Sequence, residues 1–531
     1  MDAIIISDYD VKSFSGSSPL RLTLDGQMAD IQVVLNYLQH QGKVVPPIEG
    51  HGVMTWSAAM KLNGIFLFSY LTKKGYQVGL IDNYAAERDQ FRRLIEQGPR
   101  AVIISTTFIS SKADLCEIVG EIRSMAPDVF IIAGGMFVYM SDLIFQRSQE
   151  PIYNTETIEN DYLFFRRNDP SVDLYIVSLR GEAILAEAMK RLKNGQSLDD
   201  LPNSVRNTGG QYYFTKRYDD ISDAEPATVD WDILPDRVFS TGVVPMQAST
   251  GCPHQCNFCN FTKDRRMITL KPLDAIVAEM KAVERRGAQY VWFVDDNFRL
   301  GRPDINDICR RFIQENISLQ WMTFIRADTL KNADWGLLRE AGCNELRFGL
   351  ESGDRQILEN MNKKSDPDYC RETIRGVLAA GINCTCYFIL GFPGETDETA
   401  KQTISYIQSL ECPDAEGLLS WSIYPFILAP MSPVFEAGQR ALYDLEGYLY
   451  KWKHRTMDDA RAMEHLTNAF FALSNSGPVY RGDNMRQLLA LTPAKRQEFI
   501  RERHELSKQA VLGVMTTEQV LQSFSRIFKS P

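Results

Sequence analysis

Three cysteines are clustered in one short segment of the chain, STGCPHQCNFCNF at residues 249–261. Cys252, Cys256 and Cys259 are spaced C-x3-C-x2-C and come directly after a predicted strand. Thiolates are the usual ligands of iron–sulfur clusters, and this tight spacing lets one loop reach three corners of a cubane. The remaining iron would have no protein ligand and would be open to another molecule. The segment therefore predicts a [4Fe–4S] cluster held by three residues.

Two other interpretations of these cysteines stay open. A structural zinc ion normally has four ligands, usually from two pairs of residues, and His254 lies inside the loop without a second pair. Free cysteines are also commonly buried as small apolar side chains, which is the interpretation we prefer for Cys384 and Cys386 on one predicted strand. The tight spacing disfavours simple burial for the three clustered cysteines. Simple burial remains the interpretation for the scattered ones, which are Cys116, Cys309, Cys343, Cys370 and Cys412.

The composition is that of a globular protein with ample material for a core. Of the 531 residues, 44% are hydrophobic and 24% are charged, and the formal net charge is −10. An acidic chain does not wrap a nucleic-acid backbone by bulk charge, because phosphate binding depends on an excess of Lys and Arg. No stretch approaches the roughly 18 consecutive apolar residues of a membrane span, and the acidic N-terminus lacks the features of a signal peptide. We therefore expect a cytoplasmic enzyme with no membrane span and no nucleic-acid partner.

The first 200 residues alternate short apolar runs with amphipathic segments. Residues 11–50 are polar and are interpreted as an insertion or extended loop. Continuous apolar strands separated by helices are typical of a parallel sheet that is covered on both faces. We therefore expect a doubly wound, Rossmann-like α/β domain over residues 1–200. Its strands are predicted at 3–7, 77–82, 101–105, 129–133 and 173–177, and its helices at 57–74, 112–125 and 182–192.

The alternation of strands and helices is interrupted and then resumes. Residues 201–238 are rich in Asn, Asp, Gly, Pro and Tyr and are interpreted as a linker with a hairpin at 204–216. Six strand–helix units follow and indicate a partial (β/α)6 barrel over residues 239–438 rather than an open sheet. Its strands are predicted at 243–249, 290–294, 319–325, 345–349, 383–390 and 417–424, with helices such as 272–286 and 368–380 between them.

Strand signals stop at about residue 439. Helices predicted at 457–474 and 493–512 indicate a small helical domain over residues 439–531. The segment WKHRTM at 452–457 is interpreted as a solvated helix start, although a role as a lid over a substrate or cluster is conceivable.

The cysteine motif, with the aromatic Phe258 just before its last cysteine, resembles that of the radical S-adenosylmethionine superfamily. The resemblance extends over residues 243–436 and implies that the open iron binds the amino and carboxylate groups of S-adenosylmethionine. The Pro-Gly-Thr that is usual after the sixth strand is absent. Other similar motifs follow in order at the ends of predicted strands, where barrel active sites are built: FVDDNF at 293–298, FGLESG at 348–353, GFPGET at 391–396, and Tyr424-Pro425 with Pro430 and Pro433.

The resemblance also implies roles for single residues. Glu351 would accept hydrogen bonds from ribose hydroxyls, and Ser352 would hold the carboxylate of the cofactor. Arg326 would reach a carboxylate or the substrate, and Asp295 ends the second strand of the barrel. A structural ion pair is an equally good interpretation of Asp295 and Arg326. Gly391 would shape the backbone near the cofactor, with a plain turn as the alternative.

The first domain resembles a cobalamin-binding domain. Ser105, Thr106 and Thr107 end its third predicted strand, and Gly134 and Gly135 end the fourth. Their separation is similar to that of the Ser-x-Leu and Gly-Gly elements of cobalamin domains, where small residues let the sheet edge approach the nucleotide tail of the corrin. Ligands of such sheets bind beyond the carboxyl ends of the strands, where the strand order reverses.

The cobalamin resemblance has one further match and one departure. Gly181 and Glu182, which follow the fifth strand, resemble the Gly-Glu turn of cobalamin-binding radical enzymes. The Asp-x-His-x-x-Gly motif that supplies a histidine to cobalt is missing, because His51 lacks the preceding Asp and is interpreted as an ordinary loop residue. The resemblance therefore implies cobalamin without a histidine lower ligand, with Met54, Met60, another residue or nothing facing the cobalt.

The chain is thus identified as a member of the cobalamin-dependent radical S-adenosylmethionine enzymes. The resemblance implies three cofactors, namely a [4Fe–4S] cluster, S-adenosylmethionine and cobalamin, and an electron donor such as flavodoxin or ferredoxin. The implied reaction is methylation of an unactivated carbon (or phosphorus) centre of a small molecule or peptide. A cyclase or oxidative rearrangement without net methylation stays open, as do a non-catalytic cobalamin carrier and a zinc-stabilised binding module. A methylthiotransferase is disfavoured because the N-terminal half contains no second cysteine triad.

Overall fold

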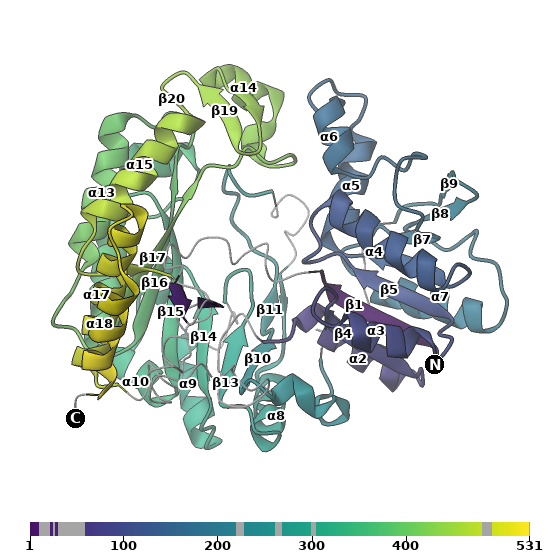
Figure 1. Ribbon diagram of the computed structural model, residues 1–531, viewed down its shortest axis with the longest axis horizontal. Coiled ribbons are helices and arrows are strands. Elements are labelled where there is room, and N and C mark those ends of the chain that lie inside the picture. Colours follow the sequence, from purple (N-terminus) through teal and green to yellow (C-terminus); the bar gives the residue numbers. More distant parts are fainter. Residues whose placement is uncertain are drawn as a thin grey trace. The chain divides into compact units, whose positions relative to one another are not determined.

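The computed structural model describes residues 1–9, 22–24, 27–29, 59–218, 228–260, 268–298, 304–479 and 491–529 (Figure 1). These residues form two compact units. One contains the N-terminal strand and Met60–Pro235, and the other contains Ser15–Ala59 and Asp236–Pro531. Among the described residues, no helix combines the length and apolar character that a bilayer crossing requires.

The first unit is built on a seven-stranded sheet with the order β4-β1-β5-β6-β7-β8-β9. The strands from β4 to β7 run parallel, and the hairpin β8–β9 continues the sheet antiparallel. The chain order reverses between β1 and β5, which is where ligands of doubly wound sheets bind. The strands are β1 (Ala3–Asp8), β4 (Val78–Asn83), β5 (Ala101–Ser105), β6 (Phe130–Gly134), β7 (Leu174–Ile176), β8 (Ser204–Thr208) and β9 (Gln211–Phe214).

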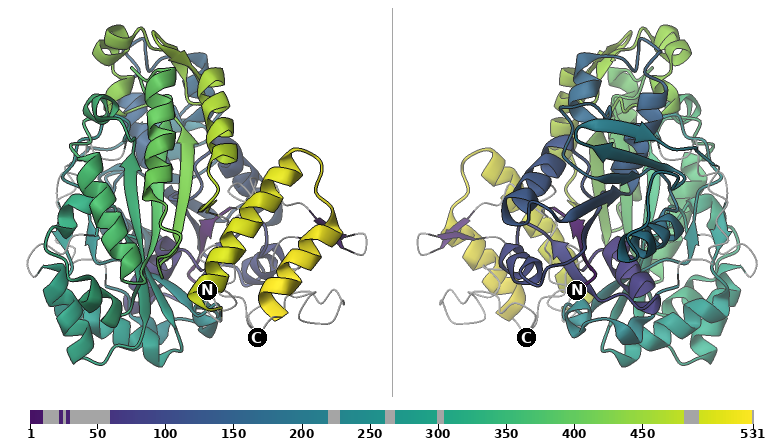
Figure 2. Two further views of the ribbon diagram at one scale, coloured as in Figure 1. Left: turned by 90° about the vertical axis from the view of Figure 1, so that its left-hand side faces the viewer. Right: turned by 90° about the vertical axis from the view of Figure 1, so that its right-hand side faces the viewer.

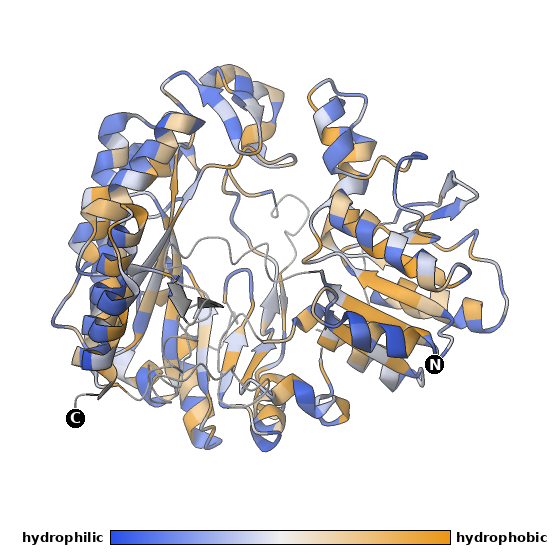
Figure 3. Ribbon diagram, in the orientation of Figure 1, coloured by the Kyte–Doolittle hydropathy of each residue, from blue (hydrophilic) through white to orange (hydrophobic). Residues whose placement is uncertain are grey.

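Helices cover both faces of this first sheet. Helices α3, α4 and α5 share one hydrophobic core with the alternate strand residues Ile4, Ile6, Val102 and Ile104. Helices α2 and α7 contact each other on the opposite face. The central strands β1, β5 and β6 are therefore apolar along most of their length, as Figure 3 shows. The helices are α2 (Leu62–Lys73), α3 (Arg88–Ile95), α4 (Lys112–Met125), α5 (Met136–Gln146), α6 (Glu156–Asp161) and α7 (Glu182–Lys193).

The prediction of a doubly wound α/β domain is confirmed, with two corrections. The hairpin predicted at 204–216 is present as β8 and β9, but it belongs to the first sheet rather than to a free linker. Helix α2 begins at Leu62 instead of residue 57. The interpretation of residues 11–50 lies mostly outside the described residues, which include there only the short hairpin β2 (Leu22–Leu24) and β3 (Gln27–Ala29).

The second unit is built on a parallel sheet with the order β10-β13-β14-β15-β16-β17-β21. Each strand is followed along the chain by helical segments that cover one face of the sheet, so the predicted partial barrel is confirmed. The strands are β10 (Val243–Met246), β13 (Tyr290–Phe293), β14 (Gln320–Phe324), β15 (Cys343–Glu351), β16 (Asn383–Leu390), β17 (Leu419–Pro425) and β21 (Gly477–Pro478). The helices are α8 (Leu273–Arg285), α9 (Ile305–Gln314), α10 (Trp335–Glu340), α11 (Arg355–Asn360), α12 (Pro367–Ala379) and α13 (Asp397–Leu410).

The C-terminal part of the second unit is not purely helical, so the prediction that strands stop at about residue 439 is wrong. A three-stranded sheet precedes α15, and β21 adds a strand to the edge of the barrel sheet. The last two helices lie side by side, as Figure 2 shows. The elements are α14 (Ala437–Tyr443), β18 (Glu446–Tyr448), β19 (Lys451–His454), β20 (Met457–Asp458), α15 (Asp459–Ala472), α17 (Pro493–Val511) and α18 (Thr517–Lys529).

Candidate active site

The three clustered cysteines lie on a loop that follows β11 (Ser249–Thr250). Cys256 is buried, and Cys252 and Cys259 are half-buried. The backbone N–H of Cys259 donates to the carbonyl oxygen of Cys256 over 3.1 Å, which makes the loop compact between these two residues. Gly251 enters the loop with φ of 89°, in the left-handed region that favours glycine.

The start of the cysteine loop is fixed by the end of β13. The Asp295 carboxylate accepts hydrogen bonds from the backbone N–H of Ala248 (3.2 Å) and from the backbone N–H and hydroxyl of Ser249 (hydroxyl 2.6 Å). Asp296 accepts from the N–H of Gly251 over 2.9 Å. Burial raises the pKa of Asp295 to about 7. In the structure the oxygens of Asp295 hold the protein loop, and its predicted contact with the cofactor stays a prediction.

The middle of the cysteine loop is docked on the segment that follows α11. The N–H of Asn257 donates to the carbonyl oxygen of Met361 (2.8 Å), and its side-chain amide donates to that of Asn360 (2.6 Å). The side-chain amide of Asn362 donates back to the carbonyl oxygen of Gln255 over 2.6 Å. The loop is therefore held from two sides by groups that do not involve the thiols.

Glu351 and Lys363 form a buried ion pair beside this docking segment. Lys363 Nζ lies 2.7 Å from Glu351 Oε1. Glu351 ends β15 in the left-handed region, with φ of 67°, after an irregularity in the strand register. A non-glycine residue in this region costs of the order of 1–3 kcal/mol, and such strain is often retained at functional sites. Sequence reasoning found Glu351 and missed Lys363, because a single lysine between two helices carries no motif of its own.

Arg326 is the second cation near the cysteine loop. Its guanidinium pairs with Asp328 (3.0 Å) and donates to the carbonyl oxygen of Lys363 (2.8 Å). Burial raises the pKa of the Cys256 thiol, and the positive charges of Lys363 and Arg326 oppose that shift. The Phe258 ring centroid lies 5.9 Å from Lys363 Nζ. The structure therefore brings together the predicted residues Phe258 and Arg326 with the cysteine loop and Glu351.

Ser352 is buried one residue beyond Glu351 and is already engaged in hydrogen bonds. Its hydroxyl lies 3.0 Å from the hydroxyl of Thr403 and accepts from the N–H of Asp354 over 3.1 Å. The N–H of Gly353 donates to the same Thr403 hydroxyl. In the structure Ser352 shapes the turn between β15 and α11, and its predicted contact with a cofactor carboxylate remains a prediction.

The turn after β16 is enclosed by residues from the C-terminal part of the chain. Gly391 has φ of 91°, and a Cβ atom at this position would lie 2.4 Å from the ring of Trp452. The Nε2–H of His454 donates to the carbonyl oxygen of Gly391 over 3.2 Å, and burial lowers the pKa of His454 to about 4. Glycine is therefore required here by both conformation and space. The interpretation of residues 452–457 as a solvated helix start is wrong, since Trp452, His454 and Met457 are buried.

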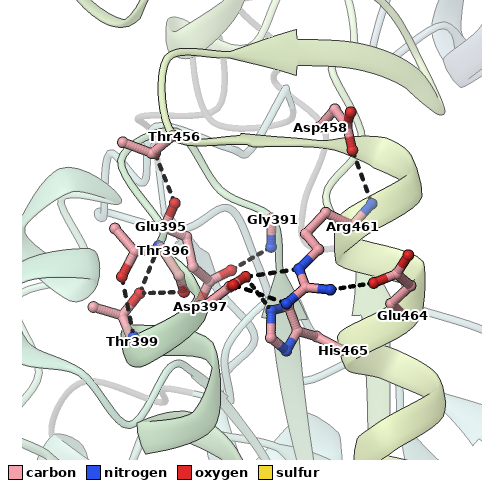
Figure 4. A network of polar contacts seen from close by, with 10 residues as sticks. All are labelled: Gly391, Glu395, Thr396, Asp397, Thr399, Thr456, Asp458, Arg461, Glu464 and His465. Carbon is pink, nitrogen blue, oxygen red and sulfur yellow. Dashed lines mark hydrogen bonds and ion pairs between the residues drawn. The ribbon is translucent and has the colours of Figure 1, made fainter.

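A network of polar contacts links the same turn to α15 (Figure 4). The N–H of Gly391 donates to the buried carboxyl of Glu395, and the Thr456 hydroxyl donates to the carbonyl oxygen of Glu395 over 2.7 Å. Asp397 accepts from the Arg461 guanidinium (2.8 Å) and contacts His465 Nε2 (2.8 Å). The hydrogen bonds from Arg461 and then from His465 lower the pKa of the Asp397 carboxyl. None of these C-terminal partners was predicted, because they are far from the turn in sequence.

In the first unit, the predicted Ser-Thr-Thr and Gly-Gly segments lie against each other. The Thr106 hydroxyl donates to the carbonyl oxygen of Gly134 over 2.9 Å. Gly135 has φ of 112°, and a Cβ atom there would lie 2.9 Å from the backbone nitrogen of Thr106 and 3.0 Å from that of Thr107. The two strand ends therefore approach as closely as a glycine allows.

A polar group lies at the reversal of strand order in the first sheet. The side-chain amide of Asn63 donates to the Ser105 hydroxyl (2.8 Å) and to the carbonyl oxygen of Ser7 (3.0 Å). Gly181 and Glu182 begin α7, and a Cβ atom at Gly181 would lie 2.7 Å from the side chain of Ile176. Asn63 was not predicted. His51 and Met54 lie outside the described residues, and Met60 is buried.

The donor set of the cysteine loop fits a cubane cluster. Within the residues that the structure describes, no three His, Cys, Asp or Glu side chains converge on a single metal ion. A cubane makes a different demand, because each of the three thiolates binds its own iron. The loop offers three thiols on one compact turn, with Lys363 and Arg326 supplying positive charge next to Cys256. Cys384 and Cys386 are buried in the core, as expected.

Comparison with known proteins finds a family model that matches part of the second unit. Residues 246–407 match the family model of the radical SAM superfamily. An uncharacterized methyltransferase of Pyrococcus horikoshii is 22% identical over 437 residues, which cover 80% of this chain and 88% of that protein. The anaerobic magnesium-protoporphyrin IX monomethyl ester cyclase of Synechocystis sp. is 23% identical over 401 residues, covering 73% of this chain and 74% of that protein.

Two solved structures show the same fold. The cobalamin-dependent S-adenosylmethionine radical enzyme OxsB with aqua-cobalamin bound has a TM-score of 0.61 and 16% identity, and the match covers 99% of this chain and 75% of that chain. The radical S-adenosylmethionine methyltransferase TsrM of Kitasatospora setae, with cobalamin and a [4Fe–4S] cluster bound, has a TM-score of 0.54 and 16% identity, covering 82% and 77%. The expected arrangement of a Rossmann-like unit followed by a partial barrel is thus shared along nearly the whole chain.

Proposed function

Because residues 246–407 match the family model of the radical SAM superfamily, we propose that this protein is a cobalamin-dependent radical S-adenosylmethionine enzyme. It methylates an unactivated carbon (or phosphorus) centre of a small molecule or peptide. When bound, the cluster and S-adenosylmethionine supply hydrogen abstraction from an unactivated carbon, and cobalamin supplies a transferable methyl group. The protein positions and shields these groups.

The observation that carries this proposal is the docking of the cysteine loop. Its start is held by Asp295, and its middle is held by Asn360 and Met361. The same docking segment ends in Lys363, whose ammonium group holds the Glu351 carboxylate. The loop that carries the three thiols for the cluster is thus hydrogen-bonded to the segment that carries the buried ion pair for the cofactor.

The chain's own residues have distinct tasks in this proposal. Cys252, Cys256 and Cys259 bind the three irons as thiolates. Glu351 accepts hydrogen bonds from the ribose of S-adenosylmethionine, and Lys363 holds that carboxylate in place through the ion pair.

The first unit supports a role in binding cobalamin. Ser105 and Gly134 end the parallel strands β5 and β6, and the strand order reverses next to β5. Gly135 lies so close to the backbone of Thr106 and Thr107 that no side chain fits at this position. OxsB and TsrM, which share the fold, bind cobalamin.

A cyclase without net methylation is the second candidate. The similarity to the Synechocystis cyclase, over 74% of its length, favours this possibility as a specific observation. Both candidates use the same residues around the cysteine loop and differ in what becomes of the substrate radical. An electron donor such as flavodoxin or ferredoxin serves either reaction.

The experiment that separates these candidates uses S-adenosylmethionine with a deuterated methyl group. The anaerobically reconstituted protein is incubated with extracts of candidate metabolites, a reductant and cobalamin, and products are followed by mass spectrometry. Methylation predicts one metabolite that carries the labelled methyl group. Formation of 5′-deoxyadenosine with a new product that lacks the label would favour the cyclase. Absence of 5′-deoxyadenosine under these conditions would contradict both.

A further inference from the structure

The two faces of the barrel sheet carry different side chains. On the outer face, Trp321 packs on Phe312 of α9 (ring centroids 6.3 Å apart), and Phe388 packs on Tyr406 of α13 (6.4 Å). Because successive side chains of a strand alternate between faces, Tyr387 lies on the inner face. Phe324 lies there with it, since the two ring centroids are 5.6 Å apart.

The inner face carries a row of aromatic rings that crosses the sheet from β13 to β17. Tyr387 lies between Phe324 (centroids 5.6 Å apart) and Tyr424 (6.4 Å), and the rings of Tyr387 and Tyr424 are within 10° of parallel. The Arg347 guanidinium lies over Trp292 (5.7 Å) and over Phe324 (5.6 Å). We call Trp292, Phe324, Tyr387 and Tyr424 the aromatic row.

The aromatic row is more accessible than the rings on the outer face. Trp321 and Phe388 are fully buried. In the row, by contrast, Trp292, Phe324 and Tyr387 are half-buried and Tyr424 is 47% exposed. The interior of a complete barrel is normally filled by packed side chains. An inner face with accessible rings is instead able to contact a ligand.

One member of the aromatic row, Tyr387, lies next to the buried ion pair of the candidate active site. Tyr387 is paired in register with Gly349, two residues before Glu351 on the neighbouring strand. Gly349 has no side chain, and a Cβ atom there would lie 2.5 Å from Glu351 Oε1 and 3.1 Å from Lys363 Nζ. A molecule lying on Tyr387 would therefore be adjacent to the group that we propose to bind S-adenosylmethionine.

The charges of the inner face are balanced beneath the row. Arg347 pairs with Glu345 over 2.8 Å, and Glu345 also accepts from the Thr385 hydroxyl over 2.7 Å. Burial raises the pKa of Tyr387 to about 12, so its phenol is neutral near pH 7. What this surface offers a ligand is chiefly the faces and edges of neutral rings, which favour other aromatic rings in stacked or edge-to-face contact.

We propose that the aromatic row binds the substrate through a flat aromatic or conjugated ring that stacks on Tyr387 and Tyr424. This assignment rests on the proposed function, because that function makes the neighbouring Glu351–Lys363 pair the cofactor site. It narrows the substrate class from any small molecule or peptide to one that contains such a ring next to the carbon that reacts.

The test uses 2-naphthoate and its saturated counterpart, decahydro-2-naphthoate, which has the same charge and nearly the same size. Binding to the full-length, cluster-reconstituted protein is measured by ligand-observed NMR titration. The variants are Tyr424→Leu, which removes the ring, and Tyr424→Phe, which keeps it. Tyr450→Leu is the control for a general effect, since Tyr450 is 58% exposed and lies outside the row.

We expect 2-naphthoate to bind more tightly than the saturated acid, and Tyr424→Leu to weaken that binding by roughly two- to tenfold, the usual effect of one aromatic pair. Tyr424→Phe and Tyr450→Leu should bind as the unaltered protein does. Equal affinity for the two acids, or loss of binding in Tyr450→Leu as well, would overturn the proposal.

The same samples separate this proposal from the function on which it rests. Iron content and binding of S-adenosylmethionine are measured alongside. Normal values with no preference for the aromatic acid would overturn the substrate class alone. Failure to incorporate iron would instead contradict the proposed function.

Discussion

Lys363 Nζ lies 2.7 Å from Glu351 Oε1, and both side chains are buried where β15 ends. The pair joins two parts of the candidate active site, because the backbone of Lys363 also accepts a hydrogen bond from Arg326 and follows the segment on which the cysteine loop is docked. The proposed cofactor site and the proposed cluster site therefore share one residue, Lys363.

Replacing Lys363 by methionine should destabilise the second unit, because it leaves the Glu351 carboxylate buried without a partner. The expected loss is about 3–5 kcal/mol, the usual effect of breaking a buried pair. Urea denaturation of the cluster-free full chain measures it. The double variant Lys363→Met/Glu351→Gln should recover part of the stability, and a double variant no more stable than the single one would argue against the pair.

Replacing Asp295 by asparagine should lower the iron content after reconstitution without unfolding the protein. Asparagine keeps the size of the side chain but replaces one of the two acceptor oxygens that hold Ala248 and Ser249. Loss of a charge-assisted hydrogen bond of this kind costs roughly 1.5–3 kcal/mol. Asp128→Asn, at an exposed position, is the matched control. Equal iron content in the two variants would show that the loop does not depend on Asp295.

The buried carboxyl of Glu395 should make stability depend on pH. Burial raises its pKa from 4.5 to about 8, so between these values the folded state holds a proton that the unfolded state releases. The free energy of unfolding therefore falls as pH rises from about 4.5 to about 8, by up to ~1.4 kcal/mol per pH unit.

Glu395→Gln removes this proton and should flatten the dependence, so the variant gains stability relative to the unaltered protein as pH rises from 5 to 8. Denaturant unfolding at several pH values within this range provides the measurement. Glu372→Gln, at an exposed position on α12, should leave the slope unchanged. An unaltered slope in Glu395→Gln would mean that this carboxyl is ionised in the folded protein.

Gly135→Ala should impair the first unit and its binding of cobalamin. The added Cβ would meet the backbone of Thr106 at 2.9 Å and would also occupy a left-handed conformation. Gly98→Ala is the matched control, because Gly98 is also left-handed (φ 63°) but has nothing within 4 Å of the added atom. We expect Gly135→Ala to retain less cobalamin than Gly98→Ala, with equal iron content in both. Equal retention of cobalamin in the two variants would show that cobalamin binding does not depend on the Gly-Gly turn.

The sequence predicted the strands of both sheets well, for a physical reason. Buried parallel strands are continuous apolar runs, and the boundaries predicted for β5 and β16 are those found. The three-stranded sheet β18–β20 was missed because its strands are short and partly exposed, so that Glu446 and Lys451 obscure the pattern. Trp452 and His454 are buried only because the turn at Gly391 lies against them, and such long-range packing has no local signal.

The candidate site was predicted in part. The cysteines and Glu351 were found because they belong to motifs with characteristic spacing. Asn360 contributes its backbone carbonyl, Asn362 its side-chain amide and Lys363 its ammonium group. These contacts form only when the strands and helices are assembled, so no local sequence pattern predicts them. Asp295 was found by its position at a strand end, but its bonding to the loop could be known only from the structure.

The most direct test of the central claim is the iron content and reactivity of the anaerobically reconstituted protein, compared with Cys256→Ala. We predict about four iron atoms per chain and, after reduction, conversion of S-adenosylmethionine to 5′-deoxyadenosine and methionine. Cys256→Ala should lose this conversion. A protein that binds zinc without iron, or that holds iron and leaves S-adenosylmethionine intact after reduction, would contradict the claim.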